Sequence, residues 1–405
     1  MTLIVAQKYI NLPRSIALTC CVLLALSGNG VSAKAAEVRS GNSGRTFADW
    51  CREKDALSPE TKHTVEVLLK EAGTTECDVA NQKLSSLTFL SLNNNKISDI
   101  KPLQSLTNLT DLFLGNNQIS DIKPLESLTN VTQLKLDNNK ISEIKPLESL
   151  AKLTSLNLID NQISDIKPLA SLTNLTDLYL NGNQITDIKP LASLTNLSWL
   201  YLIDNQISDI KPLASLTNLS WLYLDGNQIS DIKPLAFLTK LTSLYLIDNQ
   251  ISDIKPLASL TNLTSLNLID NQITDIKPLA SLTNLTSLNL IDNQISDIRP
   301  LESLTKLTLV RLDNNQISDI KPLASLINLT QLDLNNNQIS DIKPLQSLTK
   351  LTVIGLSENP IAPKNCPLKP ESICYWEAPT NPPIDTRLGV PMFPGGPVFA
   401  PDFPR

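Results

Sequence analysis

Histidine is almost absent from this chain of 405 residues, which contains only His63. Most ways of moving a proton, activating a serine or cysteine, or holding a catalytic zinc ion use histidine, so one copy leaves few of them open. The chain also has no HExxH sequence, no glycine-rich phosphate-binding loop and no CxxC pair. We therefore expect no enzyme, no cofactor and no metal site, and we interpret His63 as a solvated residue of a helix.

Positive charge and aromatic side chains are scarce as well. The formal net charge is -6, so the chain lacks the basic excess that nucleic acids or acidic membrane surfaces attract. Aromatic residues make up only 4% of the sequence, so any place where they gather is informative.

What the chain does contain is a 22-residue unit, repeated about a dozen times in the segment 87–361. It reads LTNLTDLYLNGNQITDIKPLAS at 173–194 and LTNLTSLNLIDNQITDIKPLAS at 261–282. Such a period predicts a solenoid in which each unit stacks on the next. Leu178 and Leu180 lie two residues apart and so share one face of a short strand, and a proline after each lysine disfavours long helices. We expect an α/β repeat solenoid shaped as an arc, with a parallel concave sheet and 3₁₀ turns on the convex side.

Two polar positions recur in every unit. Asparagine returns once in each unit from Asn95 to Asn359, where a buried amide can bond free backbone groups of neighbouring turns. An acid followed two residues later by a base recurs from Asp99 to Asp341. We interpret both as structural; a calcium-binding ladder on the acids is the alternative, which the adjacent lysines disfavour.

The first 33 residues are typical of a secretory signal. Lys8 and Arg14 precede the apolar run 16–26, and Val31-Ser32-Ala33 fits the cleavage rule. A retained membrane anchor is the alternative. Residues 34–45 should form a flexible leader, and the mature chain should have no span across a membrane.

Both ends of the array carry features of a cap. Residues 46–86 contain a helix start at Ser58-Pro59 and a helix end at Gly73, which predict a small helical cap. Residues 362–376 follow the last, broken unit and should close the other end. Residues 377–405 are rich in proline and should be extended or disordered; a plain linker and a short peptide ligand carrying Phe393, Phe399 and Phe403 are the two alternative roles.

Four cysteines remain once the signal is removed, and an even number in an exported protein indicates disulfides. Strands stack about 4.8 Å apart, so a dozen units hold the two caps roughly 50–60 Å apart. A disulfide needs Cα atoms within about 7 Å, which leaves only the pairs Cys51–Cys77 and Cys366–Cys374. A zinc site that gathers all four cysteines fails on the same distance.

Aromatic residues do gather on one face of the predicted sheet. If Leu178 and Leu180 face the core, the residue between them faces the concave side. This position holds tyrosine in four consecutive units, at Tyr179, Tyr201, Tyr223 and Tyr245. The neighbouring positions on the same face add tryptophan, isoleucine and a polar border, at Trp199, Trp221, Ile203, Ile247, Asp177, Asn181 and Asp225.

Aromatic side chains bury a large area each, and tyrosine and tryptophan dominate the centres of protein interfaces. An aromatic patch of this size facing water predicts a ligand site, because soluble proteins seldom leave one bare. The alternative is that the tyrosines stack on one another to stiffen the sheet and were copied as the units duplicated.

The unit resembles the internalin-type leucine-rich repeats of bacterial surface proteins at nearly every consensus position across 87–361. The resemblance implies a leucine-rich repeat horseshoe whose concave face binds a protein partner, largely through aromatic residues. The chain lacks an LPxTG sorting motif and a wall-binding module, and its caps look closer to exported internalin-like proteins of cyanobacteria. We expect an exported, monomeric, non-catalytic binding or adhesion protein at the cell surface, outside the cell or in the periplasm. Its expected partner is a protein, with a glycan second, a structural or regulatory envelope role third, and no nucleic acid.

Overall fold

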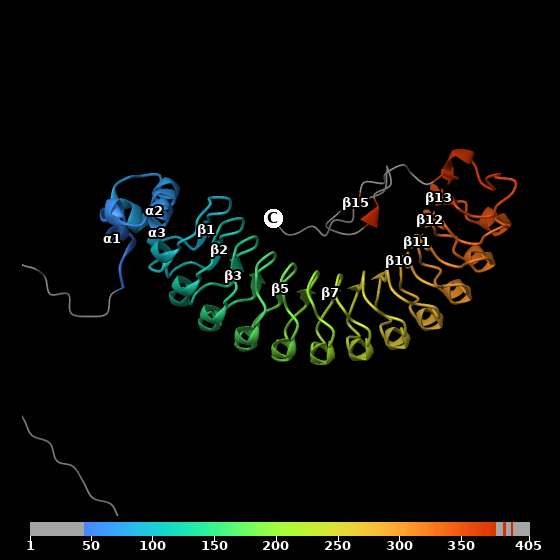
Figure 1. The fold of residues 1–405 in the computed structure, drawn as a ribbon, viewed down its shortest axis with the longest axis horizontal. Helices are drawn as coiled ribbons and strands as arrows, with labels where there is room; N and C mark the ends of the chain where they lie inside the picture. The colour runs from blue at the N-terminus through green and yellow to red at the C-terminus, as the bar shows by residue number, and fades with distance from the viewer. Residues whose placement is uncertain (1–43, 378–383, 386–389, 392–405) are drawn as a thin grey trace, which may run out of the picture. The chain divides into compact units, whose positions relative to one another are not determined.

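A computed structural model describes residues 44–377, 384–385 and 390–391 of the chain. Their main feature is one sheet of fourteen parallel strands that follow one another in sequence order from β1 to β14. The strands lie along the inner edge of an arc and the 3₁₀ helices along its outer edge (Figure 1). The strands are β1 (Phe89–Ser91), β2 (Asp111–Phe113), β3 (Gln133–Lys135), β4 (Ser155–Asn157), β5 (Asp177–Tyr179), β6 (Trp199–Tyr201), β7 (Trp221–Tyr223), β8 (Ser243–Tyr245), β9 (Ser265–Asn267), β10 (Ser287–Asn289), β11 (Leu309–Arg311), β12 (Gln331–Asp333), β13 (Val353–Gly355) and β14 (Cys374–Tyr375).

The hydrophobic core runs between the sheet and the outer turns. Leu178 on β5 pairs in register with Leu200 on β6, and both side chains are fully buried, as is Leu180 just beyond β5. Because the period is the same in every unit, each aliphatic position stacks on its own copy. Burial of each such side chain contributes roughly 1.5–3 kcal/mol before the entropy of ordering is subtracted.

The outer edge is built from short 3₁₀ helices, as predicted from the recurring proline. In most units the helix starts at a lysine, and the residue that follows it is proline, which fits the first turn of a helix. The 3₁₀ helices are η1 (Lys54–Ala56), η2 (Lys101–Leu103), η3 (Lys123–Ser127), η4 (Lys145–Ser149), η5 (Lys167–Ser171), η6 (Lys189–Ser193), η7 (Lys211–Ser215), η8 (Lys233–Phe237), η9 (Lys255–Ser259), η10 (Lys277–Ser281), η11 (Arg299–Ser303), η12 (Lys321–Ser325), η13 (Lys343–Ser347) and η14 (Glu371–Ile373).

The recurring acid accepts a hydrogen bond from the first backbone N–H of each 3₁₀ helix. The Oδ1 atom of Asp209 accepts the backbone N–H of Lys211 at 3.0 Å, and the same contact recurs along the array. The ion pair between their side chains is longer, at 3.8 Å, and exposed. Exposed pairs add little to stability, so the backbone contact is the main structural role of the acid.

The recurring asparagine forms the predicted buried ladder. The Nδ2 atom of Asn205 donates to the carbonyl oxygens of Leu180, Leu202 and Ile203 at 3.1–3.2 Å. Its Oδ1 atom accepts the N–H of Ile185 at 3.0 Å. One side chain therefore satisfies backbone groups of its own unit and of the preceding one, which is what keeps an inward turn from leaving polar groups unpaired.

Each unit then turns through a residue with positive φ, usually aspartate or asparagine. Glycine occupies this place at Gly182 and Gly226, with φ values of 63° and 62°. A Cβ atom at Gly226 would lie 2.3 Å from the Oδ1 atom of Asp204, and Gly182 stands in the same relation to Asp160. In these two units the carboxylate of the preceding aspartate fills the space where a side chain would begin, whereas in the units of Asp270 and Asp292 an aspartate follows an aspartate, so the carboxylate can also be placed elsewhere.

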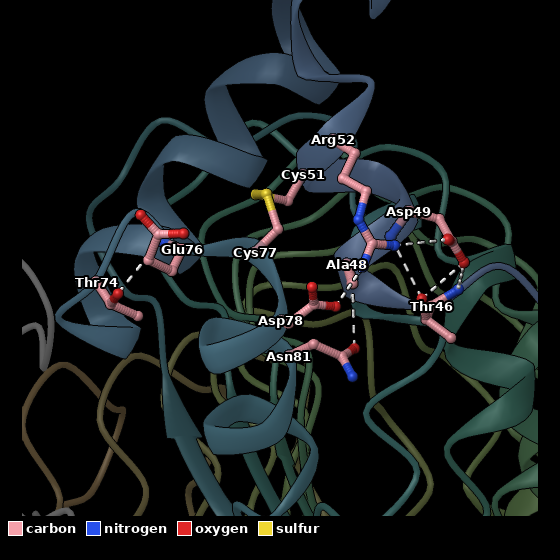
Figure 2. The surroundings of a disulfide bond; sticks show 10 residues. All are labelled: Thr46, Ala48, Asp49, Cys51, Arg52, Thr74, Glu76, Cys77, Asp78 and Asn81. Atoms are coloured by element: carbon pink, nitrogen blue, oxygen red, sulfur yellow. Dashed lines mark hydrogen bonds and ion pairs between the residues drawn. A yellow bond between two sulfur atoms is a disulfide. The ribbon is translucent and has the colours of Figure 1, made fainter.

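The N-terminal cap has three α-helices: α1 (Phe47–Arg52), α2 (Pro59–Ala72) and α3 (Cys77–Ser85). The predicted helix is α2, which begins after Ser58 and ends before Gly73. The predicted Cys51–Cys77 disulfide is confirmed and joins α1 to α3, where the side chain of Asn81 also accepts the N–H of Ala48 (Figure 2). The cap thus covers the open end of the core with a stapled set of helices.

The cap is fixed to the first unit by polar contacts. His63 is partly buried, and its Nε2 atom lies 2.7 Å from the carbonyl oxygen of Asn95. The hydroxyl of Thr64 donates to the carbonyl oxygen of Asp99 at 2.7 Å. The interpretation of His63 as a solvated residue is therefore wrong, because the side of α2 that carries it faces the array.

The C-terminal cap adds a strand that the sequence did not predict. The Cys366–Cys374 disulfide is confirmed, and it holds β14 at the edge of the sheet, where Cys374 pairs with Ile354 and Tyr375 with Gly355. The sheet therefore extends one strand beyond the last repeat.

The remaining predictions concern the two ends of the chain. The signal segment 1–33 and residues 34–43 lie outside the described residues. In the proline-rich tail, β15 (Ile384–Asp385) and β16 (Val390–Pro391) pair in antiparallel fashion, and β-branched Ile384 and Val390 favour strands. The rest of the tail beyond residue 377 lies outside the described residues. Within the part of the chain that the structure describes, no helix is long and apolar enough to cross a membrane.

Candidate functional site

The inner surface of the sheet carries three side-chain columns. The central column consists of the last residue of each strand, such as Tyr223 on β7. The leading column lies two residues earlier, as at Trp221, and the trailing column two residues later, as at Asp225. Because the strands pair in register, each column is a row of side chains that touch their neighbours above and below.

The four tyrosines of the central column form a stack across β5 to β8. The ring centroids of Tyr201 and Tyr223 are 4.4 Å apart, as are those of Tyr223 and Tyr245, with interplanar angles of 8° and 18°. Tyr179 is tilted against Tyr201 at 4.9 Å. The predicted convergence of these residues on consecutive strands is therefore seen.

Two tryptophans of the leading column lie alongside this stack. Trp199 and Trp221 are stacked on each other at 5.3 Å, and Trp221 lies nearly parallel to Tyr223 at 6.5 Å. Together they form a second hydrophobic cluster, separate from the main core, on the opposite face of the sheet. We call this cluster the aromatic face; its members are Tyr179, Trp199, Tyr201, Trp221, Tyr223 and Tyr245, with Ile159 and Ile203 packed against them.

The tyrosines are less exposed than the sequence led us to expect. Tyr201 and Tyr223 expose only 2% and 3% of their surface, and Tyr179 exposes 8%. Their rings are covered by one another and by the flanking columns, as the alternative of a stiffening stack requires. Solvent instead meets the partly exposed side chains of Trp199 and Trp221. The expected role of all these residues in ligand binding stays a prediction.

The trailing column alternates aliphatic and polar residues across the same units. The Oδ1 atom of Asn181 accepts the N–H of Ile203 at 3.1 Å, and that of Asp225 accepts the N–H of Ile247 at 2.7 Å. Ile203 and Ile247 are both partly exposed, and Ile203 packs against the tyrosine stack. The two polar side chains thus support the next strand and do not simply border the patch.

Burial changes the acid–base behaviour of the site. Burial raises the pKa of Asp225 to about 7, although the N–H of Ile247 opposes this. Burial also raises the pKa of Asp177, against a hydrogen bond from the Thr176 hydroxyl. The pKa of Tyr201 is raised to about 12 by burial, so its phenol stays neutral. The phenol of Tyr201 is therefore neutral, and the aromatic face is flanked by two carboxyl groups, of which Asp225 changes its charge near neutral pH.

A smaller aromatic group at the N-terminal end of the sheet was missed. Phe89 on β1 is 53% exposed and makes an edge-to-face contact with Phe113 on β2 at 5.3 Å. The Nζ atom of Lys135 lies 4.6 Å above the ring of Phe113. Phe89 lies in the same leading column as Trp199 and Trp221, so following that column to its N-terminal end would have found this group.

A polar cluster at the other end was also missed. Arg311 and Asp333 are register partners in the central column, with Nε and Oδ2 3.3 Å apart, and Asp333 is only 2% exposed. Burial, reinforced by Asp313, raises the pKa of Asp333 to about 7 against the effect of Arg311. Asp313 in turn accepts the N–H of Asn335 at 3.1 Å. The opposite charges at one register position were visible in the sequence as a signal for this pair.

The described residues contain no cluster of three or more histidine, cysteine, aspartate or glutamate side chains that could hold a metal ion. The acids of the outer edge, such as Asp209, instead lie beside a lysine.

Comparison with known proteins agrees with this architecture. Leucine-rich repeat family models match residues 85–193, 239–281, 283–325 and 327–368 in units of two copies, and a related model matches 173–229. The chain is 40% identical to an internalin (InlF) of Listeria monocytogenes, with a TM-score of 0.70 over 74% of this chain and 90% of that one. The chain belongs to the internalin-type leucine-rich repeat proteins. The resemblance drawn from the repeat is thereby confirmed, while the closer likeness to cyanobacterial proteins stays a prediction.

Two other structures extend the comparison of this internalin-type protein. A leucine-rich repeat protein of Leptospira interrogans is 30% identical, with a TM-score of 0.62 over 70% of this chain and 81% of that one. The plant peptide hormone receptor RGFR1, solved in complex with RGF2, shares the fold at 24% identity and a TM-score of 0.56, over 68% of this chain and 52% of that one. No curated protein matches the chain.

Proposed function

We propose that this protein is an exported, non-catalytic binding module that holds a protein partner against the aromatic face. The observation that carries the proposal is the second hydrophobic cluster on the inner surface of the sheet. A cluster in the core needs no further explanation, but one on the face of the sheet that points away from the core leaves the apolar area of its partly exposed rings in water unless a partner covers it. The disulfides in both caps support an oxidising compartment outside the cytoplasm.

The arrangement of the rings suits a binding surface. The stacked tyrosines hold the two tryptophans in place, so little side-chain entropy remains to be lost on binding. Trp199 and Trp221 present partly exposed rings near the middle of the array, and tryptophan is one of the residue types enriched at interface hot spots. Stacking and binding are therefore complementary roles of the same residues.

The test is affinity capture from the envelope of the producing cell and from neighbouring cells, with the full chain as bait. The variant is Trp199→Ala/Trp221→Ala, and the matched control is Phe237→Ala, which removes a 62% exposed aromatic ring from η8 on the outer edge. Each captured partner is then titrated against all three proteins by calorimetry.

A partner of the aromatic face should lose at least about 30-fold in affinity with the tryptophan variant, since hot-spot residues contribute about 2 kcal/mol or more, and nothing with Phe237→Ala. It should also remain bound at high salt, because salt does not screen contacts made by neutral aromatic rings. Equal affinity for all three proteins would contradict the proposal. Capture of a polysaccharide that the tryptophan variant releases would replace the protein partner by a glycan.

A further inference from the structure

The C-terminal segment has a pattern that the proposed function does not use. Residues 391–405 read PMFPGGPVFAPDFPR, with proline every third residue at Pro391, Pro394 and Pro397, and again at Pro401 and Pro404. A polyproline II helix has three residues per turn, so the first three prolines would fall on one edge and the last two on a neighbouring edge. The same segment carries three phenylalanines between the prolines.

Segments of this kind bind grooves lined by aromatic rings, because their backbone is already ordered and proline packs flat against a ring. The aromatic face offers such rings: Trp199 and Trp221 are stacked at 5.3 Å and partly exposed beside the tyrosine stack. The segment carries one acid, Asp402, and one base, Arg405, so it has no net charge that Asp177 or Asp225 would repel.

The segment also follows a strand of the same sheet, and it is long enough to reach the aromatic face. Tyr375, on the last strand, is the register partner of Gly355 and so continues the central column. Six strand steps of about 4.8 Å separate β14 from β8, about 29 Å, and eight steps, about 38 Å, separate it from β6. The nine residues that follow Tyr375 up to Ile384 are enough to span about 30 Å if fully extended.

The pairing of β15 with β16 places Pro391 opposite Ile384. Residue 391 therefore starts about as far from β14 as Ile384 does, and the whole length of residues 392–405 adds to the reach. The following fourteen residues in polyproline II geometry add about 43 Å. The total exceeds the distance to β6 with length to spare, so the prolines and phenylalanines can lie across β8 to β6 while the chain stays attached at β14.

We propose that residues 391–405 dock on the aromatic face of their own chain, as a tethered ligand that an external partner must displace. The inference rests on the proposed function, because both use the same rings. A short tether gives an effective concentration in the millimolar range, so even a weak peptide contact keeps the face occupied. A partner then binds the aromatic face only if its affinity is high enough to displace the tail.

The experiment uses a fluorescent synthetic peptide of residues 389–405, followed by anisotropy. It is titrated into the intact full chain and into a full chain with Phe393→Ser, Phe399→Ser and Phe403→Ser. The second chain is then combined with Trp199→Ala/Trp221→Ala, or with the control Phe237→Ala. A peptide of the same composition with the proline spacing scrambled is the ligand control.

We expect the peptide to bind the phenylalanine variant at least tenfold more tightly than the intact chain, whose own tail competes. Binding should disappear with the tryptophan substitutions and with the scrambled peptide, and should be unchanged by Phe237→Ala. Amide hydrogen exchange of the phenylalanine variant with and without peptide gives a second readout free of tryptophan changes: protection should rise in β6 to β8.

Equal affinity for the intact and phenylalanine-variant chains would overturn the proposal, as would no binding to either, or protection elsewhere in the array. If the intact chain forms concentration-dependent oligomers that the phenylalanine variant does not, the occupant is a second copy and docking within one chain is refuted. The two proposals fail separately: a captured partner that needs the tryptophans, with a peptide that binds nowhere, removes the tail and leaves the binding face.

Discussion

Replacing Asp225 with asparagine should stabilise the protein at pH 8 and leave its stability nearly unchanged at pH 4. Asp225 lies buried beside the tyrosine stack, and its Oδ1 atom accepts the N–H of Ile247 at 2.7 Å. An asparagine keeps this acceptor and removes the charge. The array already contains the comparison: Asn181 makes the same contact with Ile203 two units earlier.

The size and the sign follow from the pKa of this carboxyl group. It is about 7 in the folded protein, raised by burial, and about 3.9 in an unfolded chain. Between these values the folded state holds a proton that the unfolded state has lost, so stability falls as pH rises from about 4 to about 7. Below this window the carboxyl is protonated in both states and the difference vanishes. About three pKa units correspond to roughly 4 kcal/mol at pH 8.

The assay is equilibrium unfolding in urea at pH 4, 6 and 8, followed by tryptophan fluorescence. Trp199 and Trp221 lie on the strands next to Asp225 and report the middle units. Because other buried acids also titrate, the quantity to compare is the difference between the wild type and Asp225→Asn at each pH. The reciprocal change, Asn181→Asp, should lower stability at pH 8 and much less at pH 4. An effect of Asp225→Asn that is the same at all three pH values would refute the burial argument.

Three further changes test other parts of the structure. Asn205→Ala should lower the free energy of unfolding in urea by about 3–5 kcal/mol, because it leaves several buried backbone groups unpaired. The control Asn196→Ala loses one exposed hydrogen bond and should cost about 1 kcal/mol or less. Equal losses would contradict the buried ladder. Gly226→Ala should lower the thermal midpoint, at a cost of about 1–3 kcal/mol, because of the positive φ of this residue and the contact with Asp204. Adding Asp204→Ala should recover part of the loss, and no recovery would argue against the contact. Cys374→Ser should free β14 from the sheet, seen as rapid amide hydrogen exchange there with β12 still protected, and unchanged protection of β14 would show that strand pairing alone suffices.

Much of the fold could be predicted because the period repeats the same constraints. A 22-residue unit with two leucines on one strand face, an asparagine at the inward turn and a proline after each lysine leaves only a solenoid with short outer turns. The disulfide pairs followed from the length of the array, since the caps are too far apart to exchange partners. The strand β14 could not be predicted, because it lies beyond the repeated pattern and its pairing depends on where the Cys366–Cys374 loop places the chain.

In the candidate site, the sequence predicted the position of each side chain but not its exposure to solvent. Alternation along a strand correctly assigned Tyr201 and Tyr223 to the inner surface, but it says nothing about which way the rings lean. In the structure the rings stack at 4.4 Å and cover one another, so the exposed part of the cluster shifts to Trp199 and Trp221. Likewise Asp225 was expected at a polar border, yet its neighbours bury it and raise its pKa.

The sequence by itself determined the repeat, the direction in which each side chain leaves its strand, and the end caps, because these depend on local periodicity and chain length. Only the tertiary structure decided which of those side chains meet solvent and which carry a perturbed charge. Both quantities depend on how side chains from neighbouring strands, one full repeat apart in sequence, cover one another, and that packing is a property of the stacked array.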